Sequence, residues 1–211
     1  YLYLGTDNGI LVYNYRTDKY EQPDTDFPTD VRTMVLQGDT LWIGSLNGLY
    51  TYQLKSRQLN HFDSKQTGLP HNTIYSIIHT KDNQIYIGTY NGLCRYVQAS
   101  GKFENILLPV NRGGSNLFVN SLLEDAARQC IWIGMEGYLF QYNPTTGEMK
   151  AIEVFHNNSI KSLALDGDEN LLAGTDNGLY VYQNDKEPLQ HIIHDSRNIQ
   201  SVSYTHLRAH E

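Results

Sequence analysis

The chain has 211 residues, of which 40% are hydrophobic, 11% aromatic and 18% charged, and its formal net charge is -7. The excess of 23 Asp and Glu over 16 Lys and Arg disfavours a nucleic-acid binder, which needs a cationic surface. No apolar run reaches the roughly 18 to 20 residues that span a bilayer, and the 17 Gly and 16 Tyr come with almost no helical period.

A repeat runs along the chain from residue 1 to about residue 203. Residues 1–4 alternate like a strand that already lies within a repeat, and they lead into the string Gly5-Thr6-Asp7-Asn8-Gly9-Ile10. Related strings begin at Gly44, Gly88, Gly134 and Gly174, so the lead glycines lie 39, 44, 46 and 40 residues apart. This period is typical of a four-stranded propeller blade, and it does not suit a two-helix repeat because no segment is patterned as a helix.

Each unit divides into four short predicted strands. The first strand is expected at 31–36, and in the later units it begins at Ile74, Val119, Ile160 and Ile199. The second strand precedes each lead glycine, as at 41–43, and the third follows the turn, as at 49–52. The fourth strand varies most between units and is expected, for example, at 58–62. Residues 1–22 lack a first strand. The β-branched and aromatic composition fits half-buried strands. A tyrosine stands eight residues after every lead glycine, which predicts an aromatic wedge between blades.

The Asn-Gly pairs predict tight hairpin turns between the second and third strands. Such turns need positive φ at their centre, which Asn tolerates and Gly accepts without steric cost. The fourth unit has Gly137-Tyr138 in place of this pair, so its turn must differ or hold Tyr138 in an unfavourable conformation.

Residues 69–77 and 85–96 resemble the two-component regulator propeller repeat, and the resemblance extends over residues 1 to about 203. It implies an all-β fold, a β-propeller of about five blade repeats near 1–30, 31–73, 74–118, 119–159 and 160–198, with another beginning at 199. The family's ring usually has seven blades, so we expect a partial propeller that forms an open arc. Residues 204–211 fit no part of the repeat and are interpreted as a non-native tail.

The resemblance also implies a function. It suggests the periplasmic sensor region of a hybrid two-component system histidine kinase from Bacteroidetes, responsive to oligosaccharides. Neighbouring propeller and immunoglobulin-like domains of the parent protein and a homodimer are the expected partners. Two alternatives stay open: a propeller enzyme of the polysaccharide lyase or glycosidase kind, because a fold does not fix a function, and a structural propeller in another regulator.

Candidate ligand-binding positions are those where equivalent residues vary between units and stay polar or aromatic. They are the second residue of each first strand and the residue before each Asn-Gly turn, which are expected at one end of the blades. A mixture of cationic, acidic, amide and aromatic groups suits a polyhydroxylated ligand. The candidates are Arg32, Tyr75, Tyr90, Asn120, Glu136 and Lys161.

Catalytic and metal motifs are weak, and no cofactor is expected. Residues 191–194 lack the glutamate of a zinc helix, and the string at 166–170 reads as a hairpin turn because a calcium loop would need Gly at Leu171. The two cysteines, Cys94 and Cys130, belong to adjacent units, and whether they pair is left open.

Overall fold

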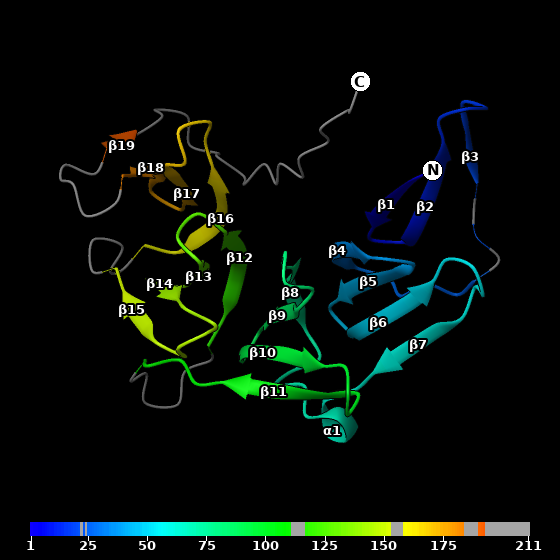
Figure 1. Ribbon diagram of the computed structural model, residues 1–211. Helices are drawn as coiled ribbons and strands as arrows, with labels where there is room; N and C mark the ends of the chain where they lie inside the picture. Colours follow the sequence, from blue (N-terminus) through cyan, green and yellow to red (C-terminus); the bar gives the residue numbers. More distant parts are fainter. Residues whose placement is uncertain (22, 24, 111–116, 153–157, 184–189, 193–211) are drawn as a thin grey trace. The chain divides into compact units, whose positions relative to one another are not determined.

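The computed structural model describes residues 1–21, 23, 25–110, 117–152, 158–183 and 190–192 (Figure 1). They form two compact units, residues 1–122 and 123–211, and each is described by itself. The strand expected from Ile199 and the tail at 204–211 lie outside the described residues.

The described chain is all-β apart from one short helix, and its strands form five antiparallel sheets of the blade type. The first sheet has three strands, β1 (Leu2–Thr6), β2 (Gly9–Asn14) and β3 (Lys19–Glu21). The absence of a first strand from this unit was predicted.

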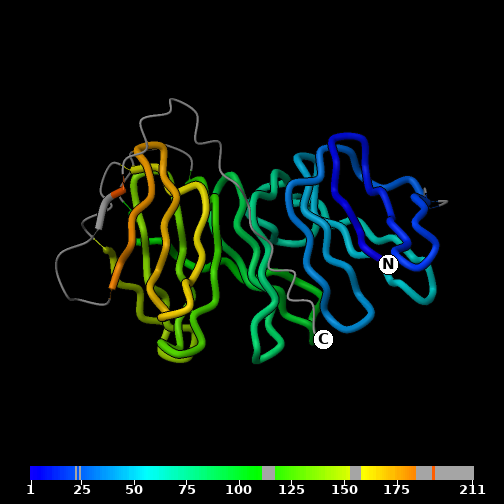
Figure 2. The backbone as a smooth tube through the Cα atoms, turned by 90° about the horizontal axis from the view of Figure 1, so that it is seen from above, coloured from blue at the N-terminus to red at the C-terminus, as the bar shows by residue number. Residues whose placement is uncertain are grey.

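The other four sheets have four strands each, in chain order. The second sheet contains β4 (Val31–Gln37), β5 (Thr40–Ser45), β6 (Gly48–Gln53) and β7 (Leu59–Phe62). The third contains β8 (Ile74–His79), β9 (Ile85–Thr89), β10 (Gly92–Val97) and β11 (Lys102–Ile106). The fourth contains β12 (Val119–Asp125), β13 (Cys130–Met135), β14 (Tyr138–Tyr142) and β15 (Met149–Ala151). The fifth contains β16 (Ile160–Leu165), β17 (Leu171–Thr175), β18 (Gly178–Tyr182) and β19 (Gln190–Ile192). Figure 2 shows how tight turns join the neighbouring strands β16, β17 and β18. This meander is the predicted blade.

The sequence did not predict the helix α1 (Ser64–Thr67). Asp63 caps it by accepting a hydrogen bond from the Lys65 N–H at 2.7 Å, and Gly68 ends it with a φ of 84°. Among the described residues no helix is long and apolar enough to cross a membrane.

The lead glycines explain how neighbouring blades approach each other. A Cβ on Gly44 would lie 2.6 Å from Cγ2 of Ile74, the first residue of the next blade's inner strand. A Cβ added to Gly5, Gly88 or Gly134 would likewise come too close to the side chain that opens the next blade. These side chains are Val31, Val119 and Ile160, respectively. Any larger residue at these positions would push the next blade away, so the repeated glycine is a packing requirement.

Two of the repeated tyrosines, Tyr96 and Tyr182, pack against the preceding blade, as predicted. Tyr96 meets Trp42 of the preceding blade edge to face, with ring centroids 4.8 Å apart, and both belong to one hydrophobic cluster. In the second unit Tyr182 meets Trp132 with centroids 6.0 Å apart. Such aromatic pairs add to the apolar packing between neighbouring blades.

Candidate functional site

A hydroxyl clamp fixes each of the four Asn-Gly turns. In the third blade Thr89 Oγ1 donates to the Gly92 carbonyl at 2.9 Å and accepts from the Asn91 N–H at 3.1 Å. Equivalent pairs of bonds are made by Thr6, Ser45 and Thr175. The residue that lies between the hydroxyl and the Asn is therefore held in a defined place at the end of the blade.

The backbone of these turns differs from the sequence prediction. The turn glycine has positive φ, for example 116° at Gly92, whereas none of the four asparagines does. Expecting positive φ at the Asn was wrong, because the turn has the hydroxyl residue at its first position and Gly at its fourth, which suits a type I turn.

The fourth turn is different, which was one of the two predicted outcomes. Met135 stands where the others have a hydroxyl, Gly137 carries the positive φ at 80°, and Tyr138 is not forced into that region. Glu136 instead forms an isolated bridge with Ser159.

Three of the predicted binding residues occupy β-bulges at the start of their strands. The pairing of β8 with β9 passes from Ile74 directly to Ser76, so Tyr75 is left out of the ladder. Arg32 and Lys161 are skipped in the same way in β4 and β16. A bulge re-aims the side chain of the extra residue. The residue before each bulge packs on the lead glycine described above, so the bulge frees the next side chain from the interface between blades.

Two of the predicted residues are brought together in the first unit. The half-buried ring of Phe118 lies between Tyr90 and Tyr75, with centroid distances of 4.2 and 6.3 Å. The ring of His71 lies 5.0 Å from that of Tyr90. We call His71, Tyr75, Tyr90 and Phe118 the aromatic cluster. Its four rings are neither buried in the core nor fully exposed.

The backbone around the aromatic cluster is tied to the neighbouring turns. The Tyr90 N–H donates to the Thr73 carbonyl at 2.9 Å, and the Thr73 N–H donates to Nδ1 of His71 at 3.0 Å. Thr73 Oγ1 donates to the Leu46 carbonyl of the preceding turn at 3.1 Å. These bonds hold the turn residues of adjacent blades in register, so the cluster is largely preformed.

The other candidates have different surroundings. Arg32 is exposed on β4, and Asn120 is half-buried and directly follows Val119 on β12. Glu136 and Lys161 are exposed and belong to the second unit, where Ser159 links the two turns because its N–H donates to Asp176 Oδ1 at 3.0 Å. The structure therefore gathers Tyr75 and Tyr90 into one cluster, and places Glu136 and Lys161 in a unit described separately.

Sequence reasoning missed Phe118 and His71. Phe118 directly precedes the residue that packs on a lead glycine, a position also held by Asp30, Thr73 and Ser159. This position varies between units as much as the predicted ones, so the same criterion would have found it.

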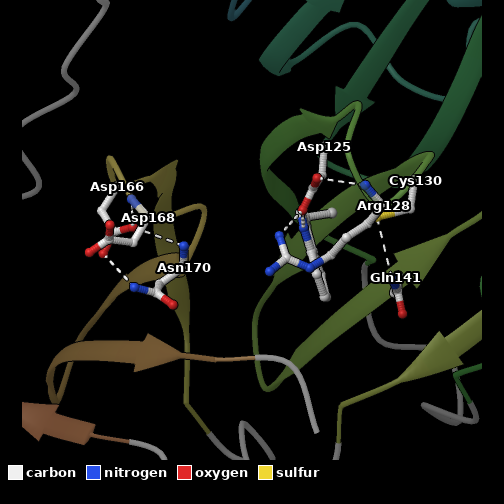
Figure 3. A network of polar contacts seen from close by, with 8 residues as sticks. Asp125, Arg128, Cys130, Gln141, Asp166, Asp168 and Asn170 are labelled. Atoms are coloured by element: carbon white, nitrogen blue, oxygen red, sulfur yellow. Dashed lines mark hydrogen bonds and ion pairs between the residues drawn. The ribbon is translucent and has the colours of Figure 1, made fainter. Parts of the chain in front are cut away.

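At the opposite end of the blades, two carboxylates of the second unit, Asp125 and Asp166, have structural roles (Figure 3). Asp125 is fully buried and accepts hydrogen bonds from the Trp132 indole at 3.0 Å and from Arg128, with which it forms an ion pair. Asp166 accepts hydrogen bonds from the backbone N–H and from the side-chain amide of Asn170. With the pairing of β16 and β17, these bonds confirm the predicted hairpin turn. No group of three or more metal-ligating side chains occurs in the part of the chain that the structure describes.

The two cysteines do not form a disulfide. Cys94 and Cys130 are both buried and unpaired, and burial raises the pKa of each thiol. A buried thiol with a raised pKa is a poor nucleophile.

Comparison with known proteins agrees with this architecture. The family model described as "Two component regulator propeller" matches residues 68–91, which carry His71, Tyr75 and Tyr90. The solved extracellular domain of a protein from B. thetaiotaomicron, assigned to a hybrid two-component system, shares 77% identity at a TM-score of 0.90 over 96% of this chain. Residues 68–91 therefore carry a repeat of the two-component regulator propeller kind.

Two more distant similarities complete the comparison. A second such extracellular domain from B. thetaiotaomicron is 20% identical, with a TM-score of 0.74 over 95% of this chain, which shows the shared fold. A protein of Formosa agariphila named Histidine kinase P4 is 26% identical over 156 residues, or 65% of this chain. This propeller chain spans only 27% and 28% of the two extracellular domains and 11% of the kinase.

Proposed function

We propose that this chain is part of the periplasmic sensor region of a hybrid two-component system. We further propose that it binds an oligosaccharide at the end of its blades that carries the turns between the second and third strands. The 77% identity to an extracellular domain assigned to such a system supports the first part. We assign the chain a binding role and no catalytic step. In this proposal residues 1–203 form one portion of a longer propeller, and residues 204–211 are not native to it.

The aromatic cluster is the observation that supports the ligand class. A sugar ring presents an apolar face and a rim of hydroxyl groups, so its binding site needs flat aromatic surfaces beside hydrogen-bonding groups. Tyr75, Tyr90 and Phe118 supply the aromatic surfaces, and the Asn120 amide follows two residues after Phe118. Arg32 stands at the equivalent bulge of the preceding blade and adds a cation at the same end.

In the second unit Glu136 and Lys161 occupy the corresponding positions and are proposed to bind ligand there. Binding would favour one arrangement of the parent protein over another, because a ligand shifts an equilibrium only by its differential affinity for the two states. The neighbouring propeller, an immunoglobulin-like domain and a second protomer are the partners through which this bias would reach a histidine kinase.

The test uses the longer extracellular protein that contains this chain. Glycan-array screening followed by calorimetry is expected to identify an oligosaccharide ligand, and Tyr90→Ala is expected to weaken its affinity about tenfold through loss of one stacking surface. Tyr13→Ala is the matched control, because Tyr13 bonds Asp18 at 2.7 Å on the first blade and lies outside the aromatic cluster. If no oligosaccharide bound, or if Tyr90→Ala bound it as tightly as the wild type, the proposal would be refuted.

A further inference from the structure

The lead glycine of the fifth blade, Gly174, differs from the others in what lies against it. A Cβ on Gly134, the lead glycine of the fourth blade, would lie 2.5 Å from Cγ2 of Ile160, which opens the first, or inner, strand of the next blade. Among the described residues, a Cβ on Gly174 would meet only Ser162, which belongs to the same blade as Gly174 itself. The place that the other lead glycines offer to a branched side chain is therefore filled by no described residue at Gly174.

The apolar side chains beside Gly174 are also less covered than their counterparts. Leu172 and Leu179 stand two residues before and five residues after the lead glycine, as Trp132 and Leu139 do in the fourth blade. Trp132 and Leu139 are 1% and 0% exposed, because they pack in the cluster between the fourth and fifth blades. Leu172 and Leu179 are only half-buried. We call Leu172, Gly174 and Leu179 the open face of the fifth blade.

Residues 199–202 of this chain, which lie outside the described residues, have the sequence that fits the open face. The inner-strand residues 160–163 are a branched apolar residue, a polar residue, serine and an apolar residue, and residues 199–202 repeat this order. Ile160 follows its lead glycine by 26 residues, and Ile199 follows Gly174 by 25. In a stack of repeats each unit packs on its neighbour through the same positions, so this register assigns Ile199 to Gly174.

The chain is long enough to bring this segment to the open face. Strand β19 ends at Ile192, so six residues join it to Ile199, and eight residues make the equivalent connection from Ala151 to Ile160. At up to about 3.5 Å per residue the shorter connection spans about 24 Å. The four strands of a blade, about 4.8 Å apart, span only about 14 Å.

We propose that residues 199–202 pack on the open face as the inner strand of a sixth blade, with the Ile199 side chain against Gly174. This interface continues the one that Ile160 makes with Gly134 in the same unit. It goes beyond the proposed function because the packing needs no ligand, and it makes the fifth blade an interior blade of the arc.

Methyl NMR of the 211-residue chain with labelled isoleucines tests this contact. The Cγ2 methyl of Ile199 is expected to give a nuclear Overhauser effect (NOE) to Hα of Gly174, because Cγ2 is the isoleucine atom that approaches the lead glycine elsewhere. The pairs Ile74 with Gly44 and Ile160 with Gly134 are the internal controls.

Thiol labelling gives a second measurement in single-cysteine additions to the same chain. The thiol of Ile199→Cys is expected to react at least about 100-fold more slowly than that of His206→Cys, a position with no counterpart in the repeat. Cys94 and Cys130 are buried in the native chain and provide the background of both variants.

Three results would overturn the proposal. The first is the absence of the NOE between Ile199 and Gly174 in a sample that shows both control NOEs. The second is an NOE that appears only between differently labelled molecules, which would mean that a second copy covers the open face. The third is equal labelling of the two cysteine variants. No oligosaccharide enters these measurements, so their outcome is independent of the proposed function.

Discussion

Replacing Arg128 by Met should destabilise the second unit far more than loss of a surface charge. Asp125 is 0% exposed, and it accepts bonds from the Trp132 indole at 3.0 Å, from the Arg128 N–H at 3.0 Å and from the guanidinium at 2.5 Å. Without the guanidinium a buried carboxylate keeps only two neutral donors. Removing one partner of a buried pair costs roughly 3 to 5 kcal/mol. Because the Arg128 side chain is 14% exposed and water can reach it, we expect about 3 kcal/mol.

Urea unfolding at pH 7 measures this loss, and two further variants make the result specific. Lys55→Met removes the surface pair with Asp39, whose side chains are 86% and 40% exposed, and should cost less than about 1 kcal/mol. The double variant Asp125→Asn with Arg128→Met removes the buried charge and keeps an acceptor for the indole, so it should recover about half of the loss. If Arg128→Met cost no more than Lys55→Met, the buried pair would not have the role described.

The same site predicts a pH dependence. Burial raises the pKa of Asp125, but hydrogen bonds from Trp132 and Arg128 outweigh it and hold the pKa below its usual value. A carboxyl with a lowered folded-state pKa stabilises the fold above the ordinary Asp value near 4, and this contribution disappears as the pH falls through the folded value. The wild type should therefore lose stability below about pH 4 more steeply than the double variant.

Two further predictions concern the turns and the thiols. Thr89→Val should lower the free energy of unfolding in urea by about 2 kcal/mol, because the buried Gly92 carbonyl loses the hydroxyl that donates to it. Thr6→Val, where the equivalent clamp is more exposed, should lower it by less than about 1 kcal/mol. Equal losses in the two variants would contradict the role of the hydroxyl clamp. A thiol reagent should leave Cys94 and Cys130 unmodified in the native chain and modify both in urea, and rapid native labelling would show that they are accessible.

The repeat predicts the blades because each repeated residue meets one strong constraint. Gly44 must be glycine since a Cβ there would collide with Ile74, and Tyr96 recurs because it fills the space beside Trp42. Such constraints are the same in every blade, so the spacing of residues along the chain was enough to place the second, third, fourth and fifth sheets.

The site was harder to predict because it depends on what differs between blades. Tyr75 and Tyr90 were selected for their variability, but their meeting depends on Phe118, which belongs to the following blade. The bulge at Tyr75 is a change of pairing register, and no residue type in the sequence encodes it alone. The positive φ of each turn falls on its glycine and not on its Asn, in turns where a hydroxyl two residues before the Asn accepts the Asn N–H and donates to the glycine carbonyl.

The most direct test of the ligand site is hydrogen–deuterium exchange of the longer extracellular protein, with and without the oligosaccharide found by screening. It shows whether the ligand binds at the blade end that carries the turns between the second and third strands. We predict slower exchange at residues 73–75, 90–92 and 117–120, where the backbone bonds of Tyr90 and Gly92 hold the aromatic cluster. Unchanged exchange in these three segments, with protection elsewhere in the protein, would contradict a ligand site at this end of the blades.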